Sequence, residues 1–124
     1  IFLAQALRDQ HIHVKGSEDR FRDFIYIDDV LHAFLATEKA LTPGANLLLN
    51  ICTGHKTYVS DLVSTIIANM DVPIGTHYEG HTPGDQFGIY GNGDLARELI
   101  QWQASTSFQE GIRRMIAWAK DTQI

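Results

Sequence analysis

Apolar residues recur along this chain at two spacings, and the longer spacing predicts helices. Intervals of three and four residues place apolar side chains on one face of a helix. Segments with helical signals are found at 1–9, 28–41, 59–70, 94–101 and 108–120. In the second segment we expect a buried stripe that consists of Val30, Phe34, Thr37 and Leu41, with Ala33 beside it.

The last predicted helix has the clearest start signal. Ser107 and Glu110 stand three positions apart, as in a capping box, where each side chain accepts a hydrogen bond from the other residue's backbone N–H. We expect the buried face of this helix to consist of Phe108, Ile112, Met115, Ile116 and Ala119.

Short segments between the helices predict strands, because they alternate in polarity or are rich in β-branched and aromatic residues. These segments are 11–15, 24–27, 47–51, 76–78 and 87–90. The run from Leu47 to Ile51 is apolar almost throughout, which is typical of a strand buried on both faces of a parallel sheet. Helices and strands alternate with no hinge-like linker, so we predict a single α/β domain over residues 1–124.

Composition narrows the class of protein further. With 124 residues, 44% of them hydrophobic and 20% charged, the chain is long and apolar enough to bury a core. A net charge of −5 without a run of Lys or Arg argues against a general nucleic-acid binder. The apolar runs are too short for a membrane span. The lone Cys52 excludes an intrachain disulfide and favours a cytoplasmic setting.

The sequence begins with Ile1 rather than Met. Its first four residues are apolar, but they have no basic leader and no long apolar core, so they do not resemble a signal peptide. We therefore expect the sequence to be a processed or truncated piece of a longer chain.

Motifs that would by themselves specify a nucleotide or a nucleophile are absent from the sequence. It has no G-x-G-x-x-G loop between a strand and a helix, no phosphate loop and no nucleophile elbow. Gly88, Gly91 and Gly93 are close together, but they belong to a long glycine-rich segment rather than to the entrance of a nucleotide-binding fold. We therefore do not expect these glycines to bind a dinucleotide.

The histidines suggest a metal site only weakly. His11 and His13 would share one face of a strand, and His77 and His81 belong to the glycine-rich segment. Metal sites need several converging ligands, and none of the recognised ligand spacings is present. We therefore expect partly exposed polar histidines and no metal.

Charged residues near the second helix have two interpretations each. Asp28 and Asp29 could be paired carboxylates for acid–base chemistry, but adjacent residues of a helix do not share a face. Stabilisation of the positive end of the helix dipole is the favoured role. Arg22 could bind a phosphate with its fork of donors, or form an ion pair with Asp19 or Asp23. On spacing alone the ion pair is favoured.

A series of short motifs indicates a family and changes the favoured interpretation of Arg22. The stretch Arg22–Val30, RDFIYIDDV, resembles the R-D-F-[IV]-[YH]-[VI]-x-D-[VL] motif of the extended short-chain dehydrogenase/reductase family, the NAD-dependent sugar-nucleotide epimerases and dehydratases. Further segments resemble later motifs of that family in the same order, and these are Leu49–Gly54, Thr57–Leu62, Thr82–Asp85, Ile100–Trp102 and Phe108–Ile112. The resemblance covers essentially the whole chain.

The resemblance implies both a fold and a role. The fold is the C-terminal, substrate-binding lobe of an extended Rossmann-type epimerase/dehydratase, with helices packed on short strands. The family's glycine-rich cofactor loop and catalytic Tyr-x-x-x-Lys pair have no counterpart in this sequence. We therefore expect no catalytic or cofactor-binding residues, no activity of the chain alone, and NAD only in a parent enzyme. Whether the chain is itself an enzyme stays open.

The same resemblance assigns substrate-binding residues. The arginine of R-D-F commonly binds the nucleotide-sugar diphosphate in the family, so a phosphate role becomes the favoured interpretation of Arg22. The family's second phosphate-binding arginine is replaced by Thr82, whose hydroxyl forms hydrogen bonds but has no charge. Asp85 ends the same motif and completes the expected set. Gln101 and Ala104 also depart from the family pattern, so the sugar, the nucleotide and the reaction stay open.

A second hypothesis is a stand-alone binding or assembly module without catalysis. In the family, a strand such as Leu47–Ile51 joins a sheet made mainly by the other domain. Without that sheet, apolar surface and strand edges would be exposed. We therefore expect the chain to form homo-oligomers.

Overall fold

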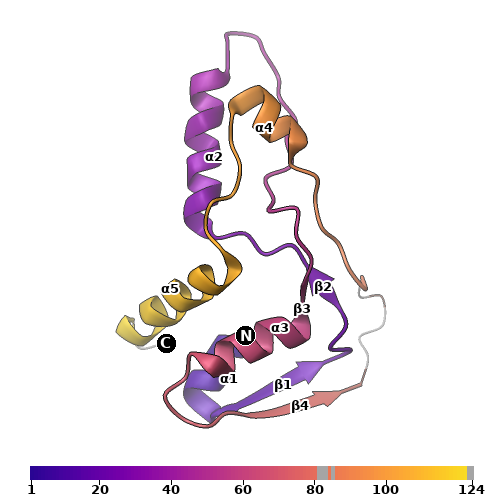
Figure 1. Cartoon of the computed structure of the whole chain (residues 1–124), viewed down its shortest axis with the longest axis vertical. Helices are drawn as coiled ribbons and strands as arrows, with labels where there is room; N and C mark the ends of the chain where they lie inside the picture. The colour runs from indigo at the N-terminus through magenta and orange to yellow at the C-terminus, as the bar shows by residue number, and fades with distance from the viewer. Residues whose placement is uncertain (81–83, 85, 123–124) are drawn as a thin grey trace.

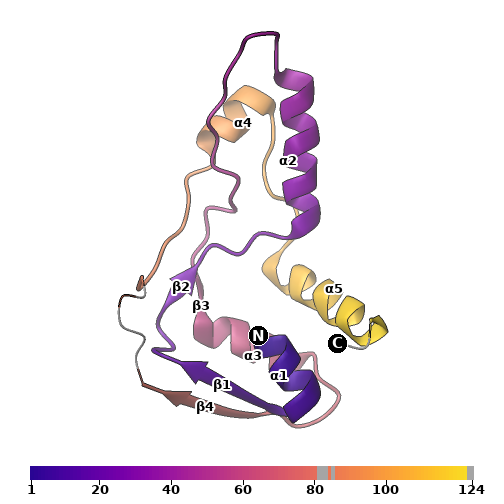
Figure 2. The same cartoon turned by 180° about the vertical axis from the view of Figure 1, so that it is seen from behind.

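The computed structural model describes residues 1–80, 84 and 86–122, and shows five helices and four short strands within them (Figures 1 and 2). In chain order these are α1 (Phe2–Asp9), β1 (His11–Lys15), β2 (Phe21–Arg22), α2 (Ile27–Ala40), β3 (Thr57–Tyr58), α3 (Val59–Ala68), β4 (Gly75–Glu79), α4 (Asp94–Ile100) and α5 (Phe108–Asp121). The molecule is elongated, with α2 and α4 at one end and β1, β4, α1 and α3 at the other. No helix within the described ranges is long and apolar enough to cross a membrane.

The end with β1 and β4 contains the larger core, which we call the sheet core. The two strands pair in parallel, from His11 opposite Gly75 to Lys15 opposite Glu79. Successive side chains of a strand point to opposite faces, and Ile12 and Val14 are fully buried on one face. α1 and α3 pack on this face and α5 packs on α3. Their buried residues are Leu3, Ala6, Val59, Val63, Ile66, Ile112, Ile116 and Ala119.

The other end consists of α2, α4 and Trp102, and we call it the helical arm. α2 packs against α4, where the small side chains of Ala33 and Ala96 are buried together with Ile100 and Trp102. The indole Nε1 of Trp102 donates a hydrogen bond to the backbone carbonyl of Asp29 at 3.1 Å. The arm therefore has a core of its own, but a smaller one than the sheet core.

The predicted buried strand Leu47–Ile51 is wrong. The segment contains no strand, and the side chain of Leu48 is 94% exposed. A strand needs a neighbour that pairs with its backbone N–H and C=O groups, and no strand in the described part of the chain pairs with this segment. Leu49 and Ile51 instead pack on the core of the helical arm, so the apolar run is half-buried.

Two further predicted strands are shorter than expected or absent. β2 is limited to Phe21–Arg22, so the predicted strand Phe24–Ile27 is wrong, and its last residue already begins α2. The backbone leaves the strand at Asp23, whose side chain accepts hydrogen bonds from other loops. In the predicted strand 87–90, a single bridge joins Gly88 to β2.

The predicted buried stripe of α2 is only partly correct. Ala33 is buried as predicted, but Phe34 is 70% exposed and Leu41 is 43% exposed. Asp29, which is not part of the predicted stripe, is buried. The helix packs on this face because Ala33 fits against α4 and because the carboxylate of Asp29 meets hydrogen-bond donors there. The opposite face exposes Ile27, Leu31, Phe34 and Leu35.

α5 starts as predicted, but only half of the capping box is formed as expected. The Ser107 hydroxyl accepts a hydrogen bond from the backbone N–H of Glu110 at 3.2 Å. The Glu110 carboxylate accepts instead from Arg113 and Arg114, at 2.7 Å in each case. Met115, which the pattern predicts to be buried, is 40% exposed.

Candidate functional site

Arg22 is the last residue of β2, at the junction between the sheet core and the helical arm. β2 pairs with β3 in antiparallel register, with Arg22 opposite Thr57. The guanidinium Nη1 of Arg22 donates to the backbone carbonyls of Phe21 at 2.8 Å and Phe87 at 3.4 Å. Arg22 is half-buried, and its hydrogen bond to the Phe87 carbonyl places the guanidinium beside that residue.

The other two predicted substrate-binding residues, Thr82 and Asp85, lie outside the described residues. The sequence that follows them directly is described. Phe87 receives a hydrogen bond from Arg22, and Gly88 forms the bridge with Phe21. The structure therefore places the residues after the predicted T-P-G-D motif next to Arg22.

Lys56 provides a second cation close to β2, which the motifs did not single out. Its Nζ lies 5.0 Å from the ring centroid of Phe21 and 4.9 Å from that of Tyr90. Both distances are within the range of cation–π attraction. Phe21 also contacts Tyr58 and Phe87 edge to face. The only sequence signal for Lys56 is its position between two family-like motifs.

Asp23 joins three segments around this site. Its carboxylate accepts hydrogen bonds from the backbone N–H of Thr53 at 2.9 Å, of Gly54 at 2.9 Å and of Gly91 at 3.2 Å. The Thr53 hydroxyl also donates to it, at 2.5 Å. Burial by itself would raise the pKa of Asp23, but these hydrogen bonds outweigh burial and the pKa is lowered. Asp23 is therefore an ionised positioning residue for the loops beside Arg22.

The glycines of the 88–93 segment make close contacts with protein atoms. A Cβ on Gly88 would lie 2.2 Å from the ring of Phe21, and a Cβ on Gly91 would lie 2.6 Å from Sγ of Cys52. These glycines are needed because neighbouring side chains fill the space in which a side chain would stand.

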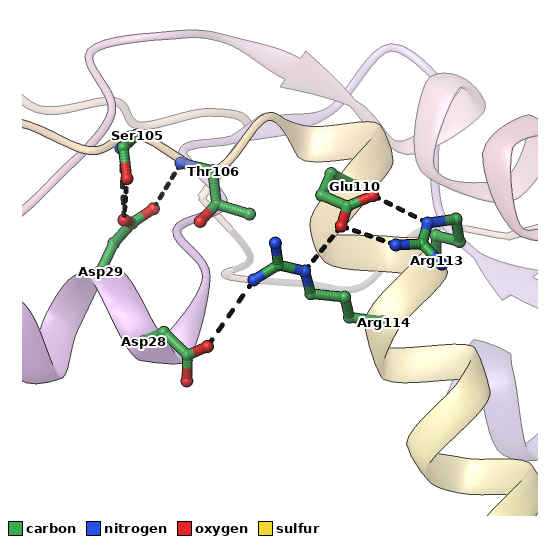
Figure 3. Close-up of polar contacts among 7 residues, drawn as sticks. All are labelled: Asp28, Asp29, Ser105, Thr106, Glu110, Arg113 and Arg114. Carbon is green, nitrogen blue, oxygen red and sulfur yellow. Dashed lines mark hydrogen bonds and ion pairs between the residues drawn. The ribbon is translucent and has the colours of Figure 1, made fainter.

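Asp29 is a buried acid at the same junction (Figure 3). Its side chain is 2% exposed and accepts hydrogen bonds from the backbone N–H of Ser105 and Thr106, at 3.2 and 2.9 Å, and from the Ser105 hydroxyl at 2.9 Å. Burial would raise the pKa of Asp29, but the hydrogen bonds outweigh it and lower the pKa. Asp28 points elsewhere, to Arg114 at 3.8 Å. The two acids are therefore not a catalytic pair, and both lie in the first turn of α2 as predicted.

Two hollows flank the segment Thr53–His55. One, of about 600 Å³, lies between this segment, α3 and residues 104–109. The other, of about 800 Å³, lies between the same segment, residues 90–94 and residues 102–104. Both are open and polar, so the junction of the sheet core and the helical arm offers space for a polar ligand.

No protein-family model matches the chain. Among curated proteins, a putative UDP-glucose 4-epimerase from Methanocaldococcus jannaschii is 31% identical over 121 residues, which are 98% of this chain and 38% of that protein. A UDP-glucose 4-epimerase from Rhizobium leguminosarum bv. trifolii is 33% identical over 104 residues, which are 82% of this chain and 32% of that protein. The chain thus spans less than two fifths of the length of these relatives.

Solved structures also match nearly the whole of this chain with about two fifths of their own length. The UDP-glucose 4-epimerase of Thermotoga maritima with UDP-glucose has a TM-score of 0.83 at 27% identity, and the match covers 99% of this chain and 39% of that chain. MoeE5 in complex with UDP-glucuronic acid and NAD has a TM-score of 0.86 at 26% identity, with 97% and 40% covered.

These similarities confirm the resemblance and the α/β fold class that the motifs predict. The part of the relatives that this chain matches is the C-terminal part of a Rossmann-type epimerase. The chain belongs to the extended short-chain dehydrogenase/reductase family, whose nucleotide-sugar epimerases it matches in their C-terminal part.

Proposed function

We propose that this chain is the part of a nucleotide-sugar epimerase-like protein that holds the diphosphate of the substrate, with Arg22 as its main charged ligand. The position of Arg22 supports this proposal, since its guanidinium contacts Phe87, two residues after Asp85 of the family-like motif. Relatives of the same fold have been solved with UDP-glucose and with UDP-glucuronic acid. A uridine diphosphate sugar is therefore the substrate class that we propose.

Lys56 has a role in the same proposal. Thr82 replaces the second arginine of the family motif and supplies no charge. Lys56 lies over the ring of Phe21, the neighbour of Arg22, and provides a positive charge close to β2. We assign Lys56 the second diphosphate charge, and we propose Thr82 and Asp85 as further polar residues that bind the substrate.

Titration with UDP-glucose tests the proposal on the 124-residue chain. By isothermal calorimetry, we expect Arg22→Ala to weaken binding about tenfold or more, because charge-assisted hydrogen bonds to phosphate are lost. Arg22→Lys keeps the charge without the fork and should lie between the wild type and Arg22→Ala. Arg8→Ala, in the last turn of α1, is the matched control and should leave binding unchanged.

Circular dichroism of each variant separates loss of binding from loss of fold. The proposal is wrong if the folded Arg22→Ala variant binds UDP-glucose as tightly as the wild type.

The chain is proposed to be inactive alone. NAD is present in structures of relatives, and the proposal that this chain does not bind it is supported by the close contacts of Gly88 with Phe21 and of Gly91 with Cys52. The sequence also lacks the family's Tyr-x-x-x-Lys pair. We expect no NAD binding in a fluorescence titration and no conversion of UDP-glucose to UDP-galactose. Turnover by the purified chain would contradict this part of the proposal.

The alternative of a stand-alone assembly module is not favoured, because the chain matches epimerases over nearly its whole length. A homo-oligomeric state and a cytoplasmic location stay predictions. The first is supported by the exposed apolar face of α2, with Ile27, Leu31, Phe34 and Leu35.

A further inference from the structure

The outer face of the β1–β4 sheet brings together three side chains with metal-binding atoms. His13 of β1 lies opposite His77 of β4 in the parallel register. Glu79 follows His77 by two residues, so its side chain points to the same face of the sheet. The sequence suggested His11 as the neighbour of His13 on this face, but the structure provides a closer partner from β4.

The three side chains converge on one point. The His13 Nε2 lies 2.9 Å from one carboxylate oxygen of Glu79, and the His77 Nε2 lies 3.4 Å from the other. One candidate ligand atom from each residue lies within 4.8 Å of those of the other two. The two imidazole rings are close, with centroids 5.1 Å apart and planes tilted by 54°. The Glu79 carboxylate thus stands between two imidazole nitrogens.

The Nε2 of His13 has the most unusual environment of the candidate ligand atoms. It is shielded from solvent, and it forms no hydrogen bond with any residue in the described part of the chain. Its close polar neighbour is the Glu79 carboxylate at 2.9 Å, an ion-pair distance, in a geometry that does not make a hydrogen bond. A nitrogen shielded in this way gains a full bonding partner when a cation binds between it and the carboxylate.

We propose that His13, His77 and Glu79 bind a divalent transition-metal ion such as Zn²⁺. Two imidazoles and one carboxylate are a known zinc ligand set, with bonds of about 2.0–2.2 Å. At such bond lengths, ligand atoms around a tetrahedral ion are about 3.4 Å apart. The separations of 2.9 and 3.4 Å between these atoms approach that value, so small side-chain rotations complete the site. A water or another external ligand takes the fourth position.

Solvent exposure and a neighbouring charge determine how tightly these residues bind a metal ion. His13, His77 and Glu79 are 39%, 56% and 49% exposed in their side chains, so water competes with the ion and binding is moderate. Lys15 lies opposite Glu79 on the same face, and its ammonium repels a cation. Lys15→Gln should therefore tighten metal binding by a few fold.

Zn²⁺ titration of tag-free protein tests the proposal, with a chromophoric chelator as competitor. We expect one equivalent to bind, and His13→Ala and His77→Ala each to weaken binding about tenfold or more, in line with the effect of losing even an indirect metal partner. Glu79→Gln changes no volume and should also weaken binding. His11→Ala is the matched control, since His11 has the same residue type on the same face of the same strand, and should change affinity less than twofold.

NMR spectra give an independent readout, since Zn²⁺ should shift the imidazole Hε1 signals of His13 and His77 before those of His32 and His55. The proposal is overturned if the wild type binds no Zn²⁺ at millimolar concentration, or if the folded His13→Ala and His11→Ala variants bind equally well. The site shares no residue with the proposed diphosphate site, so either proposal can fail without the other.

Discussion

The sheet core and the helical arm are stabilised in different ways. In the sheet core, branched aliphatic side chains such as Ile12, Val14 and Ile66 are at most 1% exposed. The helical arm buries four residues, and two of them are the small Ala33 and Ala96, beside Ile100 and Trp102. Alanine buries little apolar area, so its burial contributes little hydrophobic free energy. The arm therefore has the smaller apolar core and depends more than the sheet core on its attachments.

Those attachments are polar. Asp23 accepts hydrogen bonds from the loops at residues 53–54 and 91. Figure 3 shows that Asp29 accepts hydrogen bonds from residues 105–106. Asp23 directly follows β2, and Asp29 lies in the first turn of α2. The position of the arm relative to the sheet core therefore depends on two ionised carboxylates.

Truncation within the sheet core should have the largest effect on stability. Ile12→Ala and Ile66→Ala remove fully buried methylene groups, and each should lower the free energy of unfolding by about 2–5 kcal/mol. Urea denaturation followed by circular dichroism measures this change. Leu48→Ala is the control at a side chain that is 94% exposed, with an expected change below about 0.5 kcal/mol. Equal decreases in the free energy of unfolding for Leu48→Ala and Ile12→Ala would contradict the prediction that the sheet core dominates stability.

Removal of the Asp29 carboxylate should have the next largest effect. Asp29→Ala leaves the N–H groups of Ser105 and Thr106 without their acceptor, which costs about 1–3 kcal/mol. We expect hydrogen exchange to accelerate first in α4 and in residues 101–107. Asp28→Ala, in the same turn of α2, is the matched control and should change little. Uniform loss of protection in β1 and α3 would show that the arm is not attached independently.

Acid should weaken the attachments gradually. The pKa of Asp23 and of Asp29 is lower in the folded protein than in the unfolded chain, so both stabilise the fold above the ordinary aspartate pKa of about 3.9. Their contribution is lost as the pH falls from there through the lowered pKa values. Urea midpoints between pH 3 and 7 should fall less steeply for Asp29→Asn than for Asp28→Asn. Equal slopes would contradict this assignment.

Changes on the exposed face of α2 should have the smallest effect on stability but should alter self-association. Phe34 is 70% exposed, so Phe34→Glu should change the free energy of unfolding by less than about 0.5 kcal/mol. Sedimentation velocity should show association of the wild type at high concentration and less of it in Phe34→Glu. His32→Glu adds the same charge on α2 outside this apolar face and serves as the control. A strictly monomeric wild type would end the prediction of a homo-oligomer.

The sequence predicted elements well where local pattern and tertiary burial agree. Ile12 and Val14 alternate with polar residues, and both are buried in a strand. The pattern failed at Leu47–Ile51, because nothing local shows whether a neighbouring strand is present. It failed on α2 because the helix has two apolar faces, and the buried acid Asp29 decides which of them packs inward.

The candidate site was predictable only through its motifs. Arg22 was identified by the R-D-F stretch, whereas Lys56 belongs to no motif and is recognised only from its place over Phe21. The pairing of His13 with His77 depends on the register of two strands that are far apart in the sequence. Spacing along the chain does not encode such a register.

The contact between Gly91 and Cys52 makes the only thiol of the protein a natural reporter. Burial and the nearby charge of Asp23 raise the pKa of Cys52, so the thiol reacts slowly while the loop at residues 90–93 is closed. Cys52 is half-buried and lines the hollow beside residues 90–94, so movement of that loop should raise the alkylation rate rather than switch it on. A change in the labelling rate of Cys52 on addition of a ligand would therefore report a change at this junction, without any engineered probe.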